Sequence, residues 1–168
     1  ALVLVVSGGV EAQEASVPTH ANIVYAAVDG RDLALDLYLP RDVSGAPLLV
    51  WIHGGAWQRG SKELINTTNL VDRGFAIASV DFRNSVVAPF PAQIHDIRAA
   101  IRFLREKAGD YGYDASRIGI HGRSSGGHLT ALVSVTNGHP RLEGEVGDYL
   151  GQSSDVQAAV VYFGASNL

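Results

Sequence analysis

The sequence predicts an α/β fold in which a mostly parallel sheet follows an antiparallel N-terminal hairpin. Two apolar segments flank Asp29-Gly30, a dipeptide typical of a tight hairpin turn. After the hairpin, short apolar segments of strand length alternate with longer segments that have helical periodicity. Strands that alternate with helices usually pair in parallel, because each helix carries the chain back to the end of the sheet where the previous strand began.

The predicted strands share short runs of apolar and β-branched residues. They cover residues 22–28, 33–39, 48–52, 75–82, 117–121 and 158–163. In the second strand every other residue is a leucine, which predicts one apolar face. The last two strands are expected to be buried.

Three segments are predicted to be helical, namely residues 63–73, 92–107 and 128–136. The first is expected to end before Gly74, a typical residue after a helix. Residues 138–154 are polar and contain several glycines, so we expect them to form a loop after the third helix.

The helix predicted at residues 92–107 has two distinct faces. Its apolar stripe consists of Ile94, Ile97, Ile101 and Leu104. Arg98, Arg102 and Arg105 lie off this stripe. The apolar side is therefore expected to pack on the sheet.

Composition limits the classes of protein to consider. The 168 residues suit one domain, and 46% hydrophobic with 18% charged residues is ordinary for a globular protein. The net charge is −4 and no basic run is present, so no nucleic-acid partner is predicted. There is no cysteine, and no cluster of histidines and acids has metal-ligand spacing, so neither a metal nor a cofactor is predicted.

Residues 122–126 read Gly122-Arg123-Ser124-Ser125-Gly126, a G-x-S-x-G motif between a predicted strand and a predicted helix. A serine at the apex of such a turn projects its Oγ clear of the sheet. The flanking glycines are expected because a Cβ at either place would collide with the neighbouring strand or helix. Ser124 is therefore the candidate catalytic nucleophile, although a Gly/Ser-rich segment can also be only a turn.

A second motif, His53-Gly54-Gly55-Ala56-Trp57, directly follows the strand predicted at residues 48–52. Its backbone N–H groups at Gly54, Gly55 and Ala56, with that of Ser125, form a candidate oxyanion hole, in which Gly54 mainly shapes the turn. By itself the segment is better interpreted as a glycine turn between a strand and a loop. The two motifs together favour acyl-transfer chemistry.

Some polar and aromatic residues near these motifs have more than one interpretation. Trp57 is a candidate substrate-binding residue, or it packs the loop. His53 and His128 are expected to hold their local structure and not to act as the catalytic base. Asp81 and Arg83 are expected to pair with each other, with Asp96 as a further member.

With these motifs the chain resembles the α/β-hydrolase superfamily, and within it the secreted esterases of the hormone-sensitive-lipase-like and feruloyl/acetyl-xylan-esterase-like groups. The resemblance covers about residues 28–168. The matching segments are His53-Gly54-Gly55-Ala56-Trp57, Ser79-Val80-Asp81-Phe82-Arg83, Phe90-Pro91-Ala92-Gln93 with Asp96, and residues 122–128.

The resemblance implies an α/β-hydrolase fold and a serine carboxylic-ester hydrolase. Ser124 would attack short-chain acyl or aryl esters, as small molecules or linked to carbohydrate, and form an acyl-enzyme without a cofactor. Two departures are Ser125 where alanine is common, and Gly164-Ala165-Ser166-Asn167 where the family has a segment of the type Gly-Pro-Thr-Asp. The first is harmless, because the expected donor is a backbone N–H.

The sequence does not contain a complete triad in the order Ser, acid, His that this fold uses. After Ser124 the histidines are His128 and His139, and both precede the acids Glu143, Glu145, Asp148 and Asp155. We therefore expect the C-terminal part of the fold, with the acid and histidine, to be missing, and the chain alone to be inactive. A peptidase or arylformamidase would use the same elements, and a non-catalytic binding protein of this fold is the rival hypothesis. The oligomeric state is left open.

The first residues have the pattern of the end of a secretory signal. An apolar run at residues 1–6 is followed by Val10-Glu11-Ala12, which has small residues where a signal peptidase cleaves. We expect residues 1–12 to be a signal-peptide remnant and residues 13–168 a partial catalytic domain, secreted or periplasmic. The run is too short to span a bilayer, so no stable membrane insertion is expected. A buried N-terminal strand is the alternative.

Overall fold

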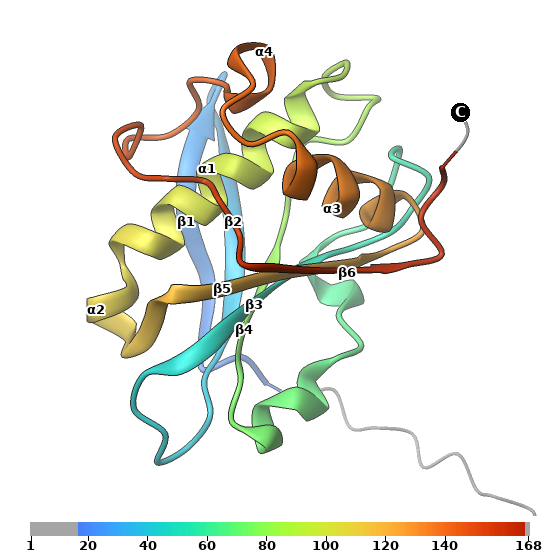
Figure 1. The fold of residues 1–168 in the computed structure, drawn as a ribbon. Helices are drawn as coiled ribbons and strands as arrows, with labels where there is room; N and C mark the ends of the chain where they lie inside the picture. The colour runs from blue at the N-terminus through green and yellow to red at the C-terminus, as the bar shows by residue number, and fades with distance from the viewer. Residues whose placement is uncertain (1–16, 167–168) are drawn as a thin grey trace, which may run out of the picture.

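Within residues 17–166, which the computed structural model describes, the chain forms a six-stranded sheet in the order β1-β2-β4-β3-β5-β6 (Figure 1). The proposed signal remnant at residues 1–12 lies outside the described residues. The strands are β1 (His20–Val28), β2 (Arg31–Tyr38), β3 (Ala46–Ile52), β4 (Ala76–Val80), β5 (Tyr113–Arg123) and β6 (Ala158–Tyr162). The helices are α1 (Ala92–Glu106), α2 (Ala108–Tyr111), α3 (Ser125–Val135) and α4 (Pro140–Glu143), with 3₁₀ helices η1 (Lys62–Leu64) and η2 (Thr68–Arg73).

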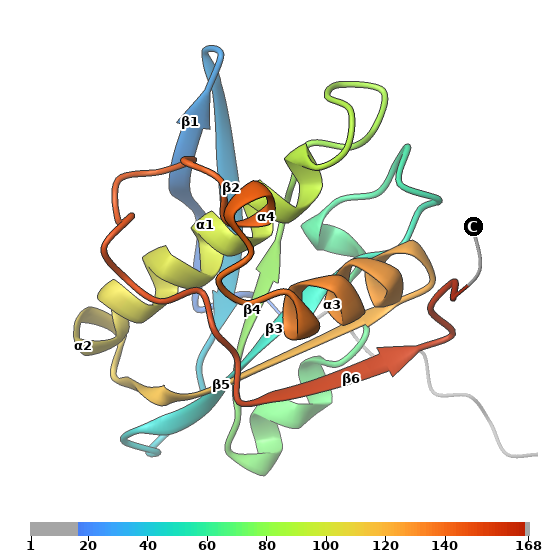
Figure 2. The same ribbon diagram turned by 45° about the horizontal axis from the view of Figure 1, so that its top comes forward.

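The predicted topology is confirmed. β1 and β2 pair antiparallel, with Val28 opposite Arg31. Asp29 and Gly30 make the turn with φ of 51° and 74°, and two positive φ values are what a tight hairpin of this kind requires. β2 also runs antiparallel to β4, whereas β4, β3, β5 and β6 are all parallel. The sheet twists strongly, so β1 and β6 run in clearly different directions (Figure 2).

Helices α1 and α3 cover one face of this sheet (Figure 1). The predicted stripe on α1 is confirmed, since Ile94, Ile97, Ile101 and Leu104 are completely buried in the main core. On the other face a smaller cluster of Tyr38, Trp51 and Ile77 packs under the segment that contains η1 and η2. No helix in residues 17–166 is long and apolar enough to cross a membrane.

The helix predicted at residues 63–73 is wrong. The segment contains two separate 3₁₀ helices, η1 and η2, with non-helical residues between them. Its C-terminal boundary is correct, because Gly74 adopts φ of 86° and caps η2. The interruption covers Ile65-Asn66-Thr67, whose polar and β-branched side chains disfavour a continuous helix.

The predicted apolar face of β2 is confirmed, since Leu33, Leu35 and Leu37 are buried, and Asp36 and Tyr38 on the opposite face are nearly as inaccessible. One expectation about strand burial fails. β6 is not a buried strand, because it lies at the edge of the described sheet and packs against α3 on one side. The side chains of Val160, Val161 and Tyr162 are exposed.

The arginines of α1 hold the segment that follows α3. Arg98 is fully buried and binds Glu143 at 3.0 Å, the Ser154 hydroxyl at 2.6 Å and the Val133 carbonyl at 3.2 Å. Arg102 donates to the carbonyls of Glu143 and Val146, and Arg105 to those of Ser153 and Asp155. The segment predicted as a loop at residues 138–154 contains the short helix α4, and these bonds fix it on α1.

Candidate active site

Ser124 lies between the end of β5 and the start of α3, as predicted. Its φ of 56° and ψ of −123° are unusual for a residue with a side chain, at a typical cost of about 1–3 kcal/mol. Its N–H donates to the Tyr162 carbonyl at 2.8 Å, and its own carbonyl accepts from the His128 N–H at 3.0 Å. These bonds hold the strained turn, and the Ser124 residue is exposed.

Close backbone packing explains the glycines of the elbow. A Cβ on Gly122 would lie 2.6 Å from both the Gly126 carbonyl oxygen and the Thr130 hydroxyl oxygen. A Cβ on Gly126 would overlap the carbonyl oxygens of Ile52 and His53 at the end of β3. The expectation that side chains here would collide with a neighbouring strand or helix is confirmed.

The glycine segment after β3 lies directly against this elbow. A Cβ built on Gly54 would be 2.9 Å from the Arg123 carbonyl oxygen and 3.4 Å from the Cβ of Ser124. Gly55, Ala56 and Trp57 follow with φ of 134°, 54° and 61°. Three consecutive residues with positive φ make a sharp, strained turn beside the serine.

The N–H groups of this turn are free to bind an anion. Gly55 uses its carbonyl oxygen to accept from the N–H groups of Gln58 and Arg59, each at 3.1 Å. The N–H groups of Gly55 and Ala56 donate no hydrogen bond to any residue in the described part of the chain. Ser125 is the first residue of α3, so its N–H has no acceptor within the helix either. Unpaired N–H groups of this kind are suited to hold an oxyanion.

The ends of the glycine loop are anchored to the sheet. The ring of His53 stacks on that of Phe82, with centroids 4.4 Å apart, and its Nδ1 lies 2.8 Å from the Gly54 carbonyl oxygen. Burial lowers the pKa of His53. At the other end, the buried Lys62 binds Asp36 at 2.9 Å, and its N–H donates to the Asp81 carboxylate at 2.7 Å.

At this second anchor, burial and hydrogen bonding act in opposite directions on the pKa of Lys62 and on that of Asp81. Burial lowers the pKa of Lys62, but its hydrogen bonds to Asp36 and Glu63 outweigh burial, so the pKa is raised overall. Burial raises the pKa of Asp81 in spite of the N–H that Lys62 donates to it.

The expected pair of Asp81 with Arg83 is wrong. Arg83 pairs with Asp96 instead, at 2.7 Å, and its backbone N–H also donates to this completely buried carboxylate at 2.9 Å. The Asp81 carboxylate instead accepts the N–H of Lys62. Gln93 adds two bonds, to the carbonyls of Arg83 and Ala88 at 2.9 Å, which fix the chain before α1.

Ser124 and Trp57 border different cavities. The cavity beside Ser124 has a volume of about 430 Å³ and is lined by Trp51, Gly54, Gly55, Arg59, Gly60, Leu64, Asn66, Arg123 and Ser124. The second, of about 220 Å³, is lined by Trp57, Ser85, Phe90, Gln93, His128 and Leu129. Trp57 as a substrate-binding residue therefore stays a prediction, for a subsite separate from that of the serine.

His128 is bonded to Trp57. The Trp57 indole N–H donates to His128 Nδ1 at 3.2 Å, and the two rings meet edge to face at 5.5 Å. Nδ1 must be unprotonated to accept this bond, and burial lowers the pKa of His128. The structure thus places His128 in a hydrogen-bonding role on the wall of the smaller cavity.

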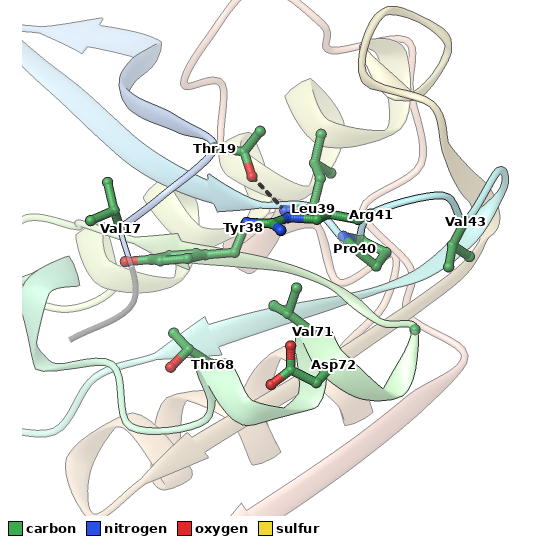
Figure 3. A pocket seen from close by; sticks show the side chains of 11 residues that line it. Val17, Thr19, Tyr38, Leu39, Pro40, Arg41, Val43, Thr68, Val71 and Asp72 are labelled. Carbon is green, nitrogen blue, oxygen red and sulfur yellow. Dashed lines mark hydrogen bonds between the residues drawn. The ribbon is translucent and has the colours of Figure 1, made fainter. Parts of the chain in front are cut away.

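A larger cavity, of about 680 Å³, lies at the other end of the sheet (Figure 3). It is formed between the end of β2 and the 3₁₀ helix η2, where Tyr38 pairs with Ile77 at the start of β4. Ser124 instead follows the carboxyl end of β5, which is parallel to β4. None of the buried, unpartnered side-chain atoms found in residues 17–166 belongs to its lining.

The described residues do not supply a base for Ser124. No histidine in residues 17–166 makes a hydrogen bond with its hydroxyl group. Glu143, one of the acids after the serine, is bound by Arg98 and Arg102. Within the same residues, no three histidines or acids are grouped as a metal ion would require.

The motifs, the elbow geometry and the sheet topology agree with the comparison to known families. The BD-FAE family model matches residues 35–168. The chain belongs to the BD-FAE family of α/β-hydrolase esterases.

Several solved structures and curated proteins similar to this BD-FAE chain carry esterase names. It is 42% identical to a bifunctional GH43-CE protein of Bacteroides eggerthii, with a TM-score of 0.80 over 86% of this chain and 20% of that one. It is 29% identical to Thermogutta terrifontis esterase 2, with a TM-score of 0.78 over 89% of this chain and 58% of that one. Esterase LipQ of Mycobacterium tuberculosis is 32% identical over 83% of this chain and 34% of LipQ. The chain thus spans about a third of this curated relative.

The cavity beside Ser124 in the BD-FAE chain also has lining residues that were not predicted as site residues, namely Trp51, Arg59, Gly60, Leu64, Asn66 and Arg123. Arg59 lines the Ser124 cavity from within the glycine loop, two residues after Trp57. Trp51 lines it from β3 and has an indole N–H without a hydrogen-bond partner among the described residues. Only the position of Arg59 beside Gly60, in a loop already marked by glycines, could have drawn attention to it.

Proposed function

We propose that the protein is a serine carboxylic-ester hydrolase that acts on short-chain acyl or aryl esters through an acyl-enzyme. The observation that carries the proposal is the strained, exposed Ser124 next to free backbone N–H groups of Gly55, Ala56 and Ser125. Family membership and the esterase names of its relatives support the same chemistry.

In the proposed reaction the Ser124 hydroxyl oxygen attacks the ester carbonyl carbon, while a histidine removes the hydroxyl proton. The N–H groups of Gly55, Ala56 and Ser125 donate to the oxyanion of the tetrahedral intermediate, and the positive end of α3 adds to their effect. The histidine then protonates the leaving alcohol. A water molecule attacks the acyl-enzyme in the same way and releases the acid.

We further propose that the histidine and its acid lie beyond Leu168 in the whole protein. The order Ser, acid, His of this fold and the longer relatives support this placement. The apolar start of the chain supports secretion or a periplasmic location.

Short acyl groups and carbohydrate-linked esters are the proposed substrates. T. terrifontis esterase 2 has been solved with propionate and with butyrate bound. The B. eggerthii relative is a bifunctional GH43-CE protein, and another relative is a carbohydrate esterase from gut microbiota. These names support the proposed substrate class.

The test is covalent labelling and turnover in the whole protein. A fluorophosphonate probe should label Ser124, and Ser124→Ala should lower kcat for p-nitrophenyl butyrate by about 10⁶-fold. Ser125→Ala is the matched control: it keeps the backbone N–H, so labelling and most of kcat should remain. Labelling at Ser125, or none at all in an active preparation, would refute the assignment.

The same experiment distinguishes the proposed esterase from the rival hypotheses. A non-catalytic binding protein would show neither labelling nor turnover in its whole form. A peptidase or arylformamidase would label at Ser124 but prefer amide or formamide substrates. Robust turnover by this chain alone, abolished by Ser124→Ala, would contradict a base beyond Leu168.

A further inference from the structure

Two arginines line the cavity beside Ser124 without any partner. Arg59 and Arg123 are both exposed, and neither takes part in an ion pair or a side-chain hydrogen bond within the described residues. Among the described residues, the rest of the lining contains no acidic side chain and consists of Trp51, Gly54, Gly55, Gly60, Leu64, Asn66 and Ser124. The cavity is therefore cationic although the whole chain has a net charge of −4.

Both arginines are attached to backbone that is fixed next to the nucleophile. Arg123 immediately precedes Ser124 at the end of β5. Arg59 donates its N–H to the Gly55 carbonyl at 3.1 Å, and a Cβ on Gly55 would overlap the Arg59 backbone. The guanidinium groups can thus approach a substrate held at Ser124 without a change in the loop.

Three acidic side chains, Glu63, Asp36 and Asp81, already have hydrogen-bond partners of their own. Glu63 accepts from Ser61 and from Lys62, and its bond from Ser61 is the main reason that its pKa is lowered to about 2. Asp36 binds Lys62, and Asp81 accepts from the Lys62 N–H. The two cavity arginines are therefore left with their charge uncompensated within the described chain.

We propose that this cavity selects esters that carry a carboxylate close to the scissile bond, and that Arg59 and Arg123 bind this carboxylate. A guanidinium and a carboxylate form strong, directional hydrogen bonds with matched geometry. An anion between two arginines also relieves their mutual repulsion, and the apolar walls of Trp51 and Leu64 reduce screening by water. The proposal rests on the proposed function only in taking Ser124 as the reacting group.

The experiment measures binding, so that it does not depend on turnover. The whole protein, carrying Ser124→Ala so that no ester is hydrolysed, is titrated with two monoanionic esters, monomethyl succinate and acetoxyacetate, and with their neutral methyl esters, and Kd is followed by NMR chemical shifts. The first acid carries its carboxylate on the acyl side of the scissile ester and the second on the alcohol side. We expect at least one anionic ester to bind about tenfold more tightly than its neutral counterpart at low salt, with shifts at Arg59 and Arg123. The preference should shrink in 0.5 M NaCl.

Three variants test the assignment of the arginines. Arg59→Gln and Arg123→Gln should each reduce the preference severalfold, and the double variant should remove it. Arg73→Gln removes the same charge from an exposed arginine before β4, away from the cavity, and should keep the preference.

Equal Kd values for anionic and neutral esters, or a preference that survives in the double variant, would overturn the inference. If the protein shows no preference for anionic esters but hydrolyses neutral esters, only the inference about the arginines fails and the proposed function stands. A clear preference without any labelling of Ser124 would support the arginine site while refuting the esterase.

Discussion

Replacing His121 by phenylalanine should make the protein more resistant to mild acid. His121 lies on β5 and is 97% buried, with its ring edge to face against Trp51 at 5.0 Å and Tyr162 at 6.4 Å. Its Nε2 is buried without a hydrogen-bond partner in residues 17–166. Burial lowers the pKa of His121 to about 4, from an ordinary value of 6.5.

The sign of the effect follows from these two pKa values. Between pH 6.5 and pH 4 the unfolded chain binds a proton at His121 and the folded chain does not, so the stability must fall as the pH falls. Each tenfold difference in proton affinity is worth about 1.36 kcal/mol, which gives about 3.4 kcal/mol below pH 4. About 2 kcal/mol of this develops between pH 7 and pH 5, where most carboxylates are still ionised.

The assay compares urea unfolding of the wild type and His121→Phe at pH 7 and pH 5. Far-UV circular dichroism is the appropriate signal, because Trp51 contacts His121 and its fluorescence would change with the substitution. The phenyl ring keeps the edge-to-face contacts and removes an unpartnered nitrogen, so at pH 7 the free energy of unfolding should change by less than about 1 kcal/mol. Between pH 7 and pH 5 the variant should lose about 2 kcal/mol less than the wild type.

A control separates titration from general destabilisation. Val133→Ala shortens a completely buried side chain of α3 that does not titrate, and it should lower stability equally at both pH values. Burial also lowers the pKa values of His53 and His128, so His121→Phe should retain some sensitivity to acid. If the wild type and His121→Phe lose the same free energy between pH 7 and pH 5, or if NMR shows His121 titrating near pH 6.5, the reasoning is wrong.

Substitutions at three further positions test the elbow, the clamp on α1 and the glycine loop. Gly126→Ala places a Cβ against the Ile52 and His53 carbonyls, and should cost about 1–3 kcal/mol in urea unfolding and abolish probe labelling in the whole protein. Arg98→Met leaves the partners of a buried ion pair unsatisfied, and should cost about 3–5 kcal/mol and speed hydrogen exchange across residues 138–155. Glycine readily adopts the φ of 54° found at Ala56, so Ala56→Gly should keep the free energy of unfolding within about 1 kcal/mol of the wild type. Proline requires φ near −65°, so Ala56→Pro should prevent this loop from folding. Circular dichroism and probe labelling check both variants.

The Ala56→Pro result would have a different meaning from the one that the motif alone suggests. A proline at this position deletes an N–H, which by itself would test the oxyanion hole. The positive φ at Ala56 means that proline also breaks the turn. A loss of activity in this variant would therefore say little about hydrogen bonding to the oxyanion.

The parts that could be predicted from the sequence are those with a local physical signature. Asp29-Gly30 determines a turn through its own backbone preference, and the two glycines of G-x-S-x-G are required by contacts only a few residues or one strand away. The stripe on α1 follows from helical periodicity and the need to cover the sheet. Each of these features is decided by neighbouring residues, so pattern and structure agree.

The parts that could not be predicted depend on contacts between distant segments. Asp36 is buried because Lys62 covers it from η1, and the alternation of β2 contains no sign of this. The sequence grouped Arg83 with both Asp81 and Asp96, and only the fold shows that Asp96 pairs with Arg83 while Asp81 accepts from Lys62. β6 is apolar like a central strand, but its exposure depends on what lies beside it in the sheet.

The arginines show how a helical pattern can be correct and still incomplete. Periodicity divides α1 into an apolar face and a basic face, and a basic face normally lies in water. Here Arg98, Arg102 and Arg105 are spaced so that they follow one side of the helix, and the chain after α3 returns along that side with a row of carbonyl oxygens and Glu143. Carbonyl groups of a loop carry no sequence signal, because every residue has one. Three arginines on one helical face, followed by a glycine-bearing segment with few apolar residues to pack, are therefore better interpreted as clamps for that segment than as a solvated surface. The same reasoning separates them from Arg59 and Arg123, which find no carbonyl or carboxylate in the described chain and so remain available to a ligand.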